Sequence, residues 1–242
     1  MQLNLLKSKV IILCGGRGKR LGNITKQIPK PLVKVGKFSI IEHKLNYYRK
    51  QGLEDFVFCI GHKGNVLKKF LKKKCKKPIF SNGGINSGIL KRIYLARNVI
   101  NTSTIISYGD TLAKINFKDL LKQHKKSKAI LSIVVAPIQN PFGLVNWNLK
   151  RKVTQFEEKP TLNHFIGYAV IEPNIFNYLN KNIINLKDGK GMVKAIQKLS
   201  SKRLVNVYKF NGLQLTVNSL SELKEAKAKI NKYFTFNEVL QK

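Results

Sequence analysis

The chain has 242 residues, of which 43% are hydrophobic and 24% are charged, as expected for a folded protein with a full core. Lysine and arginine number 46 against 12 aspartate and glutamate residues, which gives a formal net charge of +34. This charge suits a nucleic-acid or membrane binder, but the cations are spread along the whole chain and no nucleic-acid-binding motif accompanies them. We therefore expect polyanionic substrates, with neither nucleic acid nor membrane as a partner.

The three cysteines, Cys14, Cys59 and Cys75, are odd in number and lack the paired spacing of metal ligands. Cys14 and Cys59 lie in apolar runs, which is typical of small core residues in a reducing compartment. The N-terminal residues show no signal-peptide pattern, and no apolar run approaches the roughly 20 residues of a membrane span. We expect a soluble cytoplasmic protein.

The apolar run Val10–Leu13 predicts a buried strand, and the glycine-rich sequence GGRGKR follows it. Glycines let backbone amides approach a ligand closely, and Lys19 and Arg20 add positive charge at the same place. Such a turn is typical of a phosphate-binding loop. Lys30 lies between Pro29 and Pro31, whose fixed φ angles direct its side chain. This stretch therefore indicates an anion-binding site.

Two well-known phosphate-binding loops do not fit this stretch. A P-loop needs a Gly-Lys-Ser/Thr run, which is absent here, and the dinucleotide fingerprint needs a third glycine where the chain has Leu21. The pattern GGxGxRL followed by PKPL resembles the sugar-1-phosphate nucleotidylyltransferase family instead; the alternative is a tight turn with surface cations. The resemblance implies catalytic roles for Arg20 and Lys30. It also implies that the nucleotide is held by Leu13, Gly15, Gly16, Gly18 and Lys19.

The following segments predict alternating helices and strands. Ser39 and Glu42 form a capping-box pattern for a helix that ends near Gly52, and a strand at Phe56–Ile60 and a helix at 65–74 come next. This order predicts an α/β protein with a mostly parallel sheet flanked by helices. The resemblance implies one Rossmann-like nucleotidyltransferase domain over residues 1–242. The sequence DFVFCIGHKGNVLKKF is most similar to the CTP-dependent branch, the glucose-1-phosphate cytidylyltransferases.

A further apolar strand at 104–107 ends in Tyr-Gly-Asp, with Asp110 just past its carboxyl end. Open α/β sheets bind ligands at this edge, although an aspartate in an ordinary turn is the alternative. The resemblance implies that Asp110 binds Mg²⁺ on the triphosphate, in keeping with the preference of this ion for one or two carboxylates plus phosphate oxygens. Ser87 and Gly88 match the first two residues of the family's TGG-like turn at the nucleotide base, unless Ser87 merely caps a helix.

The next segments predict a helix at 117–124 and a strand at 129–135, followed by motifs that the resemblance assigns to the sugar phosphate. Gly143 would leave room for the sugar, Glu158 would accept its hydroxyl groups, and Lys159 would meet its phosphate. EEKP alone is equally typical of a solvated turn. Gly167 is retained in a strand where Phe165 and Ile166 replace the family's Asn and Gly, which leaves the sugar open.

In the last third, Pro173 is predicted to start a helix, and residues 174–201 are predicted to form two helical pieces around Gly189 and Gly191. A final helix is predicted from Leu220 to about Phe236. In NGLQLTVNSL, Asn218 stands where the family has its second metal-binding aspartate. An amide oxygen can bind Mg²⁺ but brings no charge. Ser219 and Glu222 predict another capping box.

We therefore expect Mg²⁺-dependent transfer of a nucleotide from an NTP, with CTP favoured, to a sugar 1-phosphate. The attacking phosphate has a second pKa near about 6 and is already ionised, so positioning and charge neutralisation replace a general base. Three alternatives stay open: a non-catalytic nucleotide-binding homologue, suggested by Asn218; a guanylyl or thymidylyl transferase; and a nucleic-acid binder, suggested by the charge. A homo-oligomer also stays open.

Overall fold

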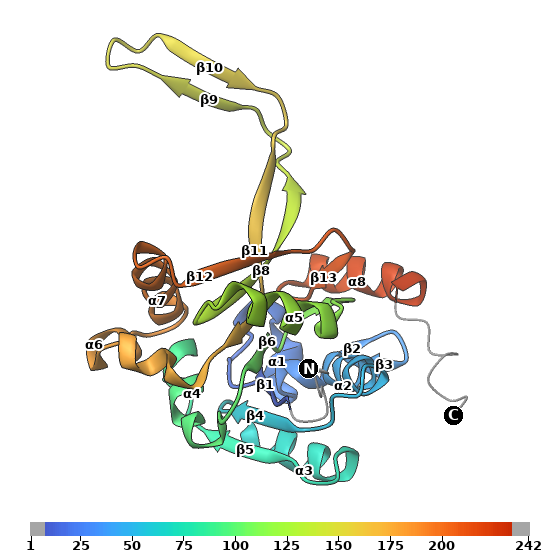
Figure 1. The fold of residues 1–242 in the computed structure, drawn as a ribbon. Coiled ribbons are helices and arrows are strands. Elements are labelled where there is room, and N and C mark those ends of the chain that lie inside the picture. The colour runs from blue at the N-terminus through green and yellow to red at the C-terminus, as the bar shows by residue number, and fades with distance from the viewer. Residues whose placement is uncertain (1–7, 234–242) are drawn as a thin grey trace.

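The computed structural model describes residues 8–233, and the expected end of the last helix near Phe236 lies outside them. Seven strands form one sheet in the order β12-β8-β11-β6-β1-β4-β5 (Figure 1). They are β1 (Val10–Leu13), β4 (Phe56–Ile60), β5 (Ile79–Asn82), β6 (Thr104–Tyr108), β8 (Leu131–Gln139), β11 (Thr161–Ile171) and β12 (Val205–Lys209). Three two-stranded pairs join β2 (Lys34–Val35) to β3 (Phe38–Ser39), β7 (Thr111–Ala113) to β13 (Gln214–Thr216), and β9 (Leu144–Trp147) to β10 (Val153–Glu157).

The sheet is mainly parallel, as the sequence predicts. Strand β1 pairs in parallel with β4 and β6, β4 with β5, and β8 with β12, whereas β11 runs antiparallel to both of its neighbours. Because β11 is reversed, its amino-terminal half leaves the sheet at the edge where β1 and β6 end.

Helices cover both faces of the sheet. They are α1 (Asn23–Gln27), α2 (Ile40–Lys50), α3 (Gly64–Lys74), α4 (Ile89–Leu95), α5 (Phe117–Ser127), α6 (Lys181–Ile184), α7 (Lys190–Ser201) and α8 (Leu220–Tyr233), with 3₁₀ turns at Lys19–Leu21, Lys30–Leu32, Arg97–Val99 and Pro173–Tyr178.

Alternate residues of β1 point to opposite faces of the sheet. Val10 and Ile12 pack with α2, α3 and α5, and Ile11 packs with α4, α6 and α7. A smaller apolar cluster holds α8 against β13 and the β2–β3 hairpin.

Local signals decide where these helices begin. The predicted capping box of α2 is confirmed: the Ser39 amide donates to the Glu42 carboxylate at 3.0 Å, and the Glu42 amide donates to the Ser39 hydroxyl. The second box is half formed, because the Glu222 amide donates to Ser219 but the Glu222 carboxylate accepts from the backbone of Asn218. Pro173 begins a 3₁₀ turn rather than an α-helix, and Gly191 lies inside α7, so residues 173–201 form three helical pieces rather than two.

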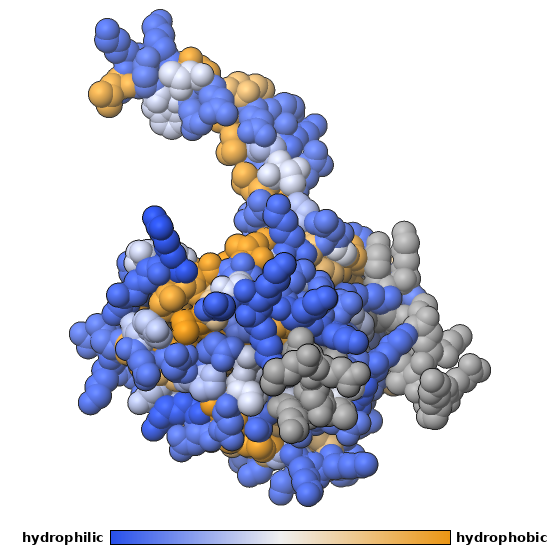
Figure 2. Space-filling model, in the orientation of Figure 1, coloured by the Kyte–Doolittle hydropathy of each residue, from blue (hydrophilic) through white to orange (hydrophobic). Residues whose placement is uncertain are grey.

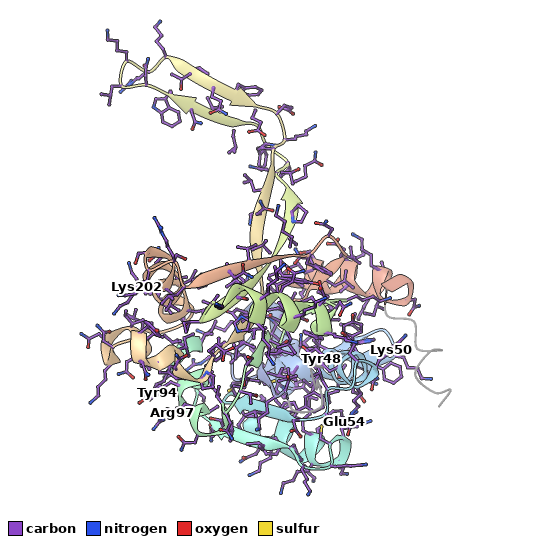
Figure 3. The ribbon with its side chains drawn as sticks, in the orientation of Figure 1. Tyr48, Lys50, Glu54, Tyr94, Arg97 and Lys202 are labelled. Atoms are coloured by element: carbon purple, nitrogen blue, oxygen red, sulfur yellow. The ribbon has the colours of Figure 1, made fainter. Side chains whose placement is uncertain are left out.

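One part of the chain stands clear of the body. The β8–β11 ladder continues past the sheet edge and carries β9 and β10 as a two-stranded antiparallel ribbon (Figure 1). Every residue of β9 and β10 is exposed. Figure 3 shows the side chains of this ribbon projecting into open space, whereas those of the body interlock between helices and sheet. No helix within residues 8–233 has the length and apolar character needed to cross a membrane.

Candidate functional site

A pocket of about 240 Å³ opens at the carboxyl ends of β1 and β6, and it gathers residues from both ends of the chain. Eight of the residues predicted for the site line it: Leu13, Gly16, Gly18, Lys19, Arg20, Lys30, Asp110 and Asn218. Gly15 adjoins this set in the chain. The glycine turn, the Lys30 turn and the two residues after β6, Gly109 and Asp110, therefore share one cavity at the edge where open α/β sheets bind ligands.

Lys30 is the centre of the pocket. Its ammonium group donates to the Asp110 carboxylate at 2.8 Å and to the Asn218 amide oxygen at 2.7 Å. The Lys30 side chain is 13% exposed and that of Asp110 is 27% exposed, so the pair is shielded but reachable. The side-chain oxygens of Asp110 and Asn218 therefore converge on one positive charge. Carboxylate and amide oxygens are ligand types that suit Mg²⁺, a hard cation. Within residues 8–233 there is no cluster of three or more His, Cys, Asp or Glu side chains that could hold a metal ion.

Close packing explains two glycines around the pocket. Gly18 has φ +64°, and a Cβ atom there would lie 2.9 Å from Thr25 and 3.2 Å from Lys30. At Gly109 a Cβ would lie 2.4 Å from the carbonyl oxygen of Leu13. A Cβ at Gly16 would meet no atom of the described residues within 4 Å. Packing within the protein thus accounts for Gly18 and Gly109, and the open space at Gly16 is available to a ligand.

Arg92 is a residue of the site region that sequence reasoning missed. Its buried guanidinium donates to the carbonyls of Ile60 at 2.9 Å, Gly15 at 3.2 Å and Gly84 at 2.8 Å, and burial lowers its pKa. One side chain from α4 therefore holds the glycine turn, the end of β4 and the loop after β5. The sequence feature that could have identified Arg92 is its position on the apolar face of a helix, between Leu90 and Ile93.

Lys44 and Tyr168 form a second support that was missed. Both side chains are buried beneath the Asp110–Thr111 turn: Lys44 donates to the Thr111 carbonyl at 2.5 Å and to the Tyr168 hydroxyl at 2.8 Å, and Tyr168 donates to the same carbonyl. Burial lowers the pKa of Lys44 to about 7. The sequence feature that could have identified Lys44 is its position on the apolar face of α2.

Cys14 also lines the pocket, and its thiol is fully enclosed. Burial raises the pKa of this thiol far above its ordinary value. Because the thiolate is the reactive form, Cys14 is an inert part of the pocket wall rather than a nucleophile.

Ser87 and Gly88 lie outside the residues that line the pocket. Ser87 donates its hydroxyl to the Gly83 carbonyl, and Gly88, not Ser87, precedes α4 as its cap. A Cβ at Gly88 would lie 2.1 Å from the Leu186 carbonyl oxygen, so close backbone packing explains this glycine. Contact with the nucleotide base stays a prediction for both residues.

The predicted sugar-phosphate residues are divided between two places. Gly143, Glu158 and Lys159 sit together at the base of the β9–β10 ribbon, where Glu158 and Lys159 are exposed and their charged groups lie 3.6 Å apart. Gly167 lies eight positions further along the chain than Lys159, inside β11. Gly167, at φ +78°, packs against the Tyr108 ring two residues before Asp110. The structure thus brings Gly167 to the edge of the site and leaves the other three on the ribbon.

Comparison with known proteins gives a consistent picture. A family profile described as "Nucleotidyl transferase" matches residues 9–230. The chain is 28% identical to a Bacillus subtilis protein named "Probable glucose-1-phosphate cytidylyltransferase", over 90% of this chain and 94% of that protein. It is 30% identical to the D-glycero-alpha-D-manno-heptose 1-phosphate guanylyltransferase of Campylobacter jejuni, over 73% of this chain and 78% of that protein. The fold is similar to that of HddC from Yersinia pseudotuberculosis complexed with GMP-PN, with a TM-score of 0.69, 16% identity, and coverage of 92% and 99% of the two chains.

Proposed function

Because the chain belongs to the nucleotidyl transferase family and its relatives are sugar-1-phosphate nucleotidyltransferases, we propose that it makes a CDP-sugar and pyrophosphate from CTP and a sugar 1-phosphate. The observation that carries this proposal is the Lys30 ammonium held between Asp110 and Asn218 in a pocket walled by the glycine turn. The preference for CTP is supported by the match to the cytidylyltransferase relative, which extends over more of the chain than the guanylyltransferase match.

The reaction needs charge neutralisation more than acid–base chemistry. An oxygen of the sugar phosphate attacks the α-phosphorus of CTP, and the bond from the α-phosphorus to the bridging oxygen breaks to release pyrophosphate. Both reactants are anions, so their repulsion is the main barrier. In the proposal Lys19 and Arg20 bind the β- and γ-phosphates, and Lys30 lies against the α-phosphate, where negative charge shifts during attack.

Asp110 and Asn218 are the residues that would hold Mg²⁺ in this proposal. Their oxygens already converge on one cation, the Lys30 ammonium. Bound Mg²⁺ would supply additional neutralisation of the triphosphate charge. Asn218 provides an oxygen without charge, so Asn218→Asp should tighten metal binding, measurable as a lower Mg²⁺ concentration for half-maximal activity.

The proposal is tested by Lys30→Ala. Removing one donor aimed at the reacting phosphate lowers the rate by about 10²–10³-fold, measured as pyrophosphate released from four NTPs with a panel of sugar 1-phosphates. Lys34→Ala is the matched control, because Lys34 is exposed on β2 and does not line the pocket, so it should retain wild-type rate. A Lys30→Ala enzyme within about tenfold of wild type contradicts the catalytic role. Faster turnover with another NTP contradicts the CTP assignment alone.

One observation favours a second candidate, a nucleotide-binding protein without catalysis. The pocket offers one carboxylate, Asp110, and the amide of Asn218 where the resemblance expects another acid. Calorimetry separates the two functions: binding of CTP with Mg²⁺ but no pyrophosphate release over the whole sugar 1-phosphate panel supports the non-catalytic protein.

A further inference from the structure

Lys44 is the only buried lysine among those whose side chains the structure describes, and it is 2% exposed. Figure 2 shows that hydrophilic residues cover most of the visible surface of the body, where lysines ordinarily lie. The Lys44 amine donates its two hydrogen bonds to a carbonyl and a hydroxyl group rather than to a carboxylate. A buried basic group without a carboxylate partner stabilises a core less well than an apolar residue of the same size. Stability therefore does not explain the presence of Lys44.

The group that Lys44 holds is the backbone carbonyl of Thr111. Lys44 donates to this carbonyl at 2.5 Å, and the Tyr168 hydroxyl donates to it at 2.7 Å. The Lys44 amine also lies 4.6 Å from the centre of the Tyr168 ring, so the two side chains form one buried unit. Its two donated bonds need only two N–H groups, which the neutral amine and the ammonium group both have. The contact with Thr111 therefore does not depend on the protonation state of Lys44.

Thr111 in turn contacts the carboxylate of Asp110, which it follows in the chain. The Thr111 hydroxyl donates to Asp110 Oδ1 at 3.4 Å, while Asp110 Oδ2 accepts from Lys30 at 2.8 Å. The Asp110 carbonyl accepts from the amide of Val217 at 2.9 Å, and Asn218 is the next residue. A displacement of Thr111 would therefore move the Asp110 carboxylate relative to both Lys30 and Asn218.

Helix α2 carries Lys44 and is also bonded to the turn that presents Lys30. The Ile40 amide at the start of α2 donates at 3.0 Å to the carbonyl of Val33, which ends that turn. Ile40 and Lys44 are four residues apart and therefore lie on the same face of the helix. One helix thus fixes both members of the Lys30–Asp110 pair, the first through Val33 and the second through Lys44.

We propose that Lys44 is a positioning residue for the side-chain oxygens of Asp110 and Asn218. It holds the Thr111 carbonyl from the core, so that the Asp110 carboxylate stays aligned with Lys30 and Asn218 in the pocket. This role rests on the proposed function, in which those two oxygens would bind Mg²⁺. Removing a group that orients a metal ligand typically lowers metal affinity or activity by about 10–100-fold. Lys44 itself does not line the pocket, so it acts through Thr111.

Lys44→Met and Tyr168→Phe test this role in the full chain, with Tyr47→Phe as the matched control. Tyr47 is also on α2, and its hydroxyl donates to a backbone carbonyl further along the same segment, that of Ile115, at 3.1 Å. Lys44→Met should raise the Mg²⁺ concentration for half-maximal pyrophosphate release by about 10–100-fold, with the NTP and sugar 1-phosphate that the wild type uses best. Tyr168→Phe should raise it by a smaller factor, because Lys44 still holds the carbonyl. Tyr47→Phe should leave it unchanged.

Two further measurements separate positioning from a general role in stability. In urea denaturation, Lys44→Met should be at least as stable as the wild type, because a buried basic group is removed and Tyr168 still donates to the carbonyl. In NMR relaxation of the free protein, the backbone order parameter of Asp110 should fall from about 0.85, typical of rigid backbone, toward about 0.6 in Lys44→Met. It should stay at the rigid value in Tyr47→Phe. The order parameter requires no substrate.

Three results overturn the proposal. The first is a folded Lys44→Met protein with the Mg²⁺ requirement of the wild type. The second is an equal rise of that requirement in Tyr47→Phe, which would indicate a general loosening of α2. The third is an unstable Lys44→Met protein together with a wild-type Mg²⁺ requirement in Tyr168→Phe. A wild type that releases no pyrophosphate with any substrate pair contradicts the proposed function instead, and the Asp110 order parameter then decides: a lower value in Lys44→Met supports the role of Lys44, and an unchanged value overturns it.

Discussion

Strands β4 and β10 each have five residues, and their surroundings could hardly differ more. All five residues of β4 are buried between helices, whereas all five of β10 are exposed. Phe58 packs in the core with Phe56 and Phe80, and Phe156 has only its neighbours on the ribbon. The comparison teaches that β-forming residues produce a strand in both places, but stability comes from what lies over the strand.

The largest change in stability that tests this comparison is expected when one phenylalanine in each strand is truncated. Phe58→Ala should lower the free energy of unfolding by about 3–5 kcal/mol, because it opens a cavity in a packed core. Phe156→Ala should change it by less than about 0.5 kcal/mol, because no cavity forms at an exposed site. Both are measured by urea denaturation followed by far-UV circular dichroism. Equal losses would show that the ribbon is packed in solution as the core is.

A buried and an exposed lysine extend the comparison to charge. The pKa of Lys44 is lowered by burial to about 7, while an unfolded lysine titrates near about 10.4. Between these values the unfolded chain binds more protons, so Lys44 makes the free energy of unfolding rise with pH by up to about 1.4 kcal/mol per unit. Lys44→Met should remove this slope, as seen in denaturation curves from pH 7 to 10. Lys159→Met, at an exposed position on the ribbon, is the matched control for the loss of a lysine side chain.

The smallest effect concerns local hydrogen bonds. Ser39→Ala removes the cap of α2, which underlies the Lys44 contacts, and should lower the free energy of unfolding by about 0.5–2 kcal/mol. Asn146→Ala removes a side-chain hydrogen bond to Gln155 on the exposed β9–β10 ribbon and should change the free energy of unfolding by less than about 0.5 kcal/mol. Thermal unfolding followed by circular dichroism measures both. A larger loss for Asn146→Ala would mean that the ribbon stabilises the rest of the fold.

The sequence predicted those parts of the molecule whose signals are local. The first strand, the capping box at Ser39 and the parallel sheet all follow from short patterns, and eight site residues predicted one by one meet in a single pocket. The predicted strand at 129–135 is the part of β8 that lies in the sheet, but a strand pattern carries no information on whether other elements cover the segment that follows it. Lys44 and Arg92 were missed for the same reason, since their partners are backbone carbonyls up to 77 residues away.

Arg92 joins three segments through one guanidinium: the glycine turn, the end of β4 and the loop after β5. Segments tied to a single anchor open together or not at all. In amide hydrogen exchange, the backbone near Gly15 and Gly84 should therefore show one common free energy of opening, and Arg92→Lys, which keeps the charge but loses the fork of donors, should split it into separate values. The glycine turn that walls the pocket would then open as one unit with two segments outside the pocket, held by a residue that does not line the cavity itself.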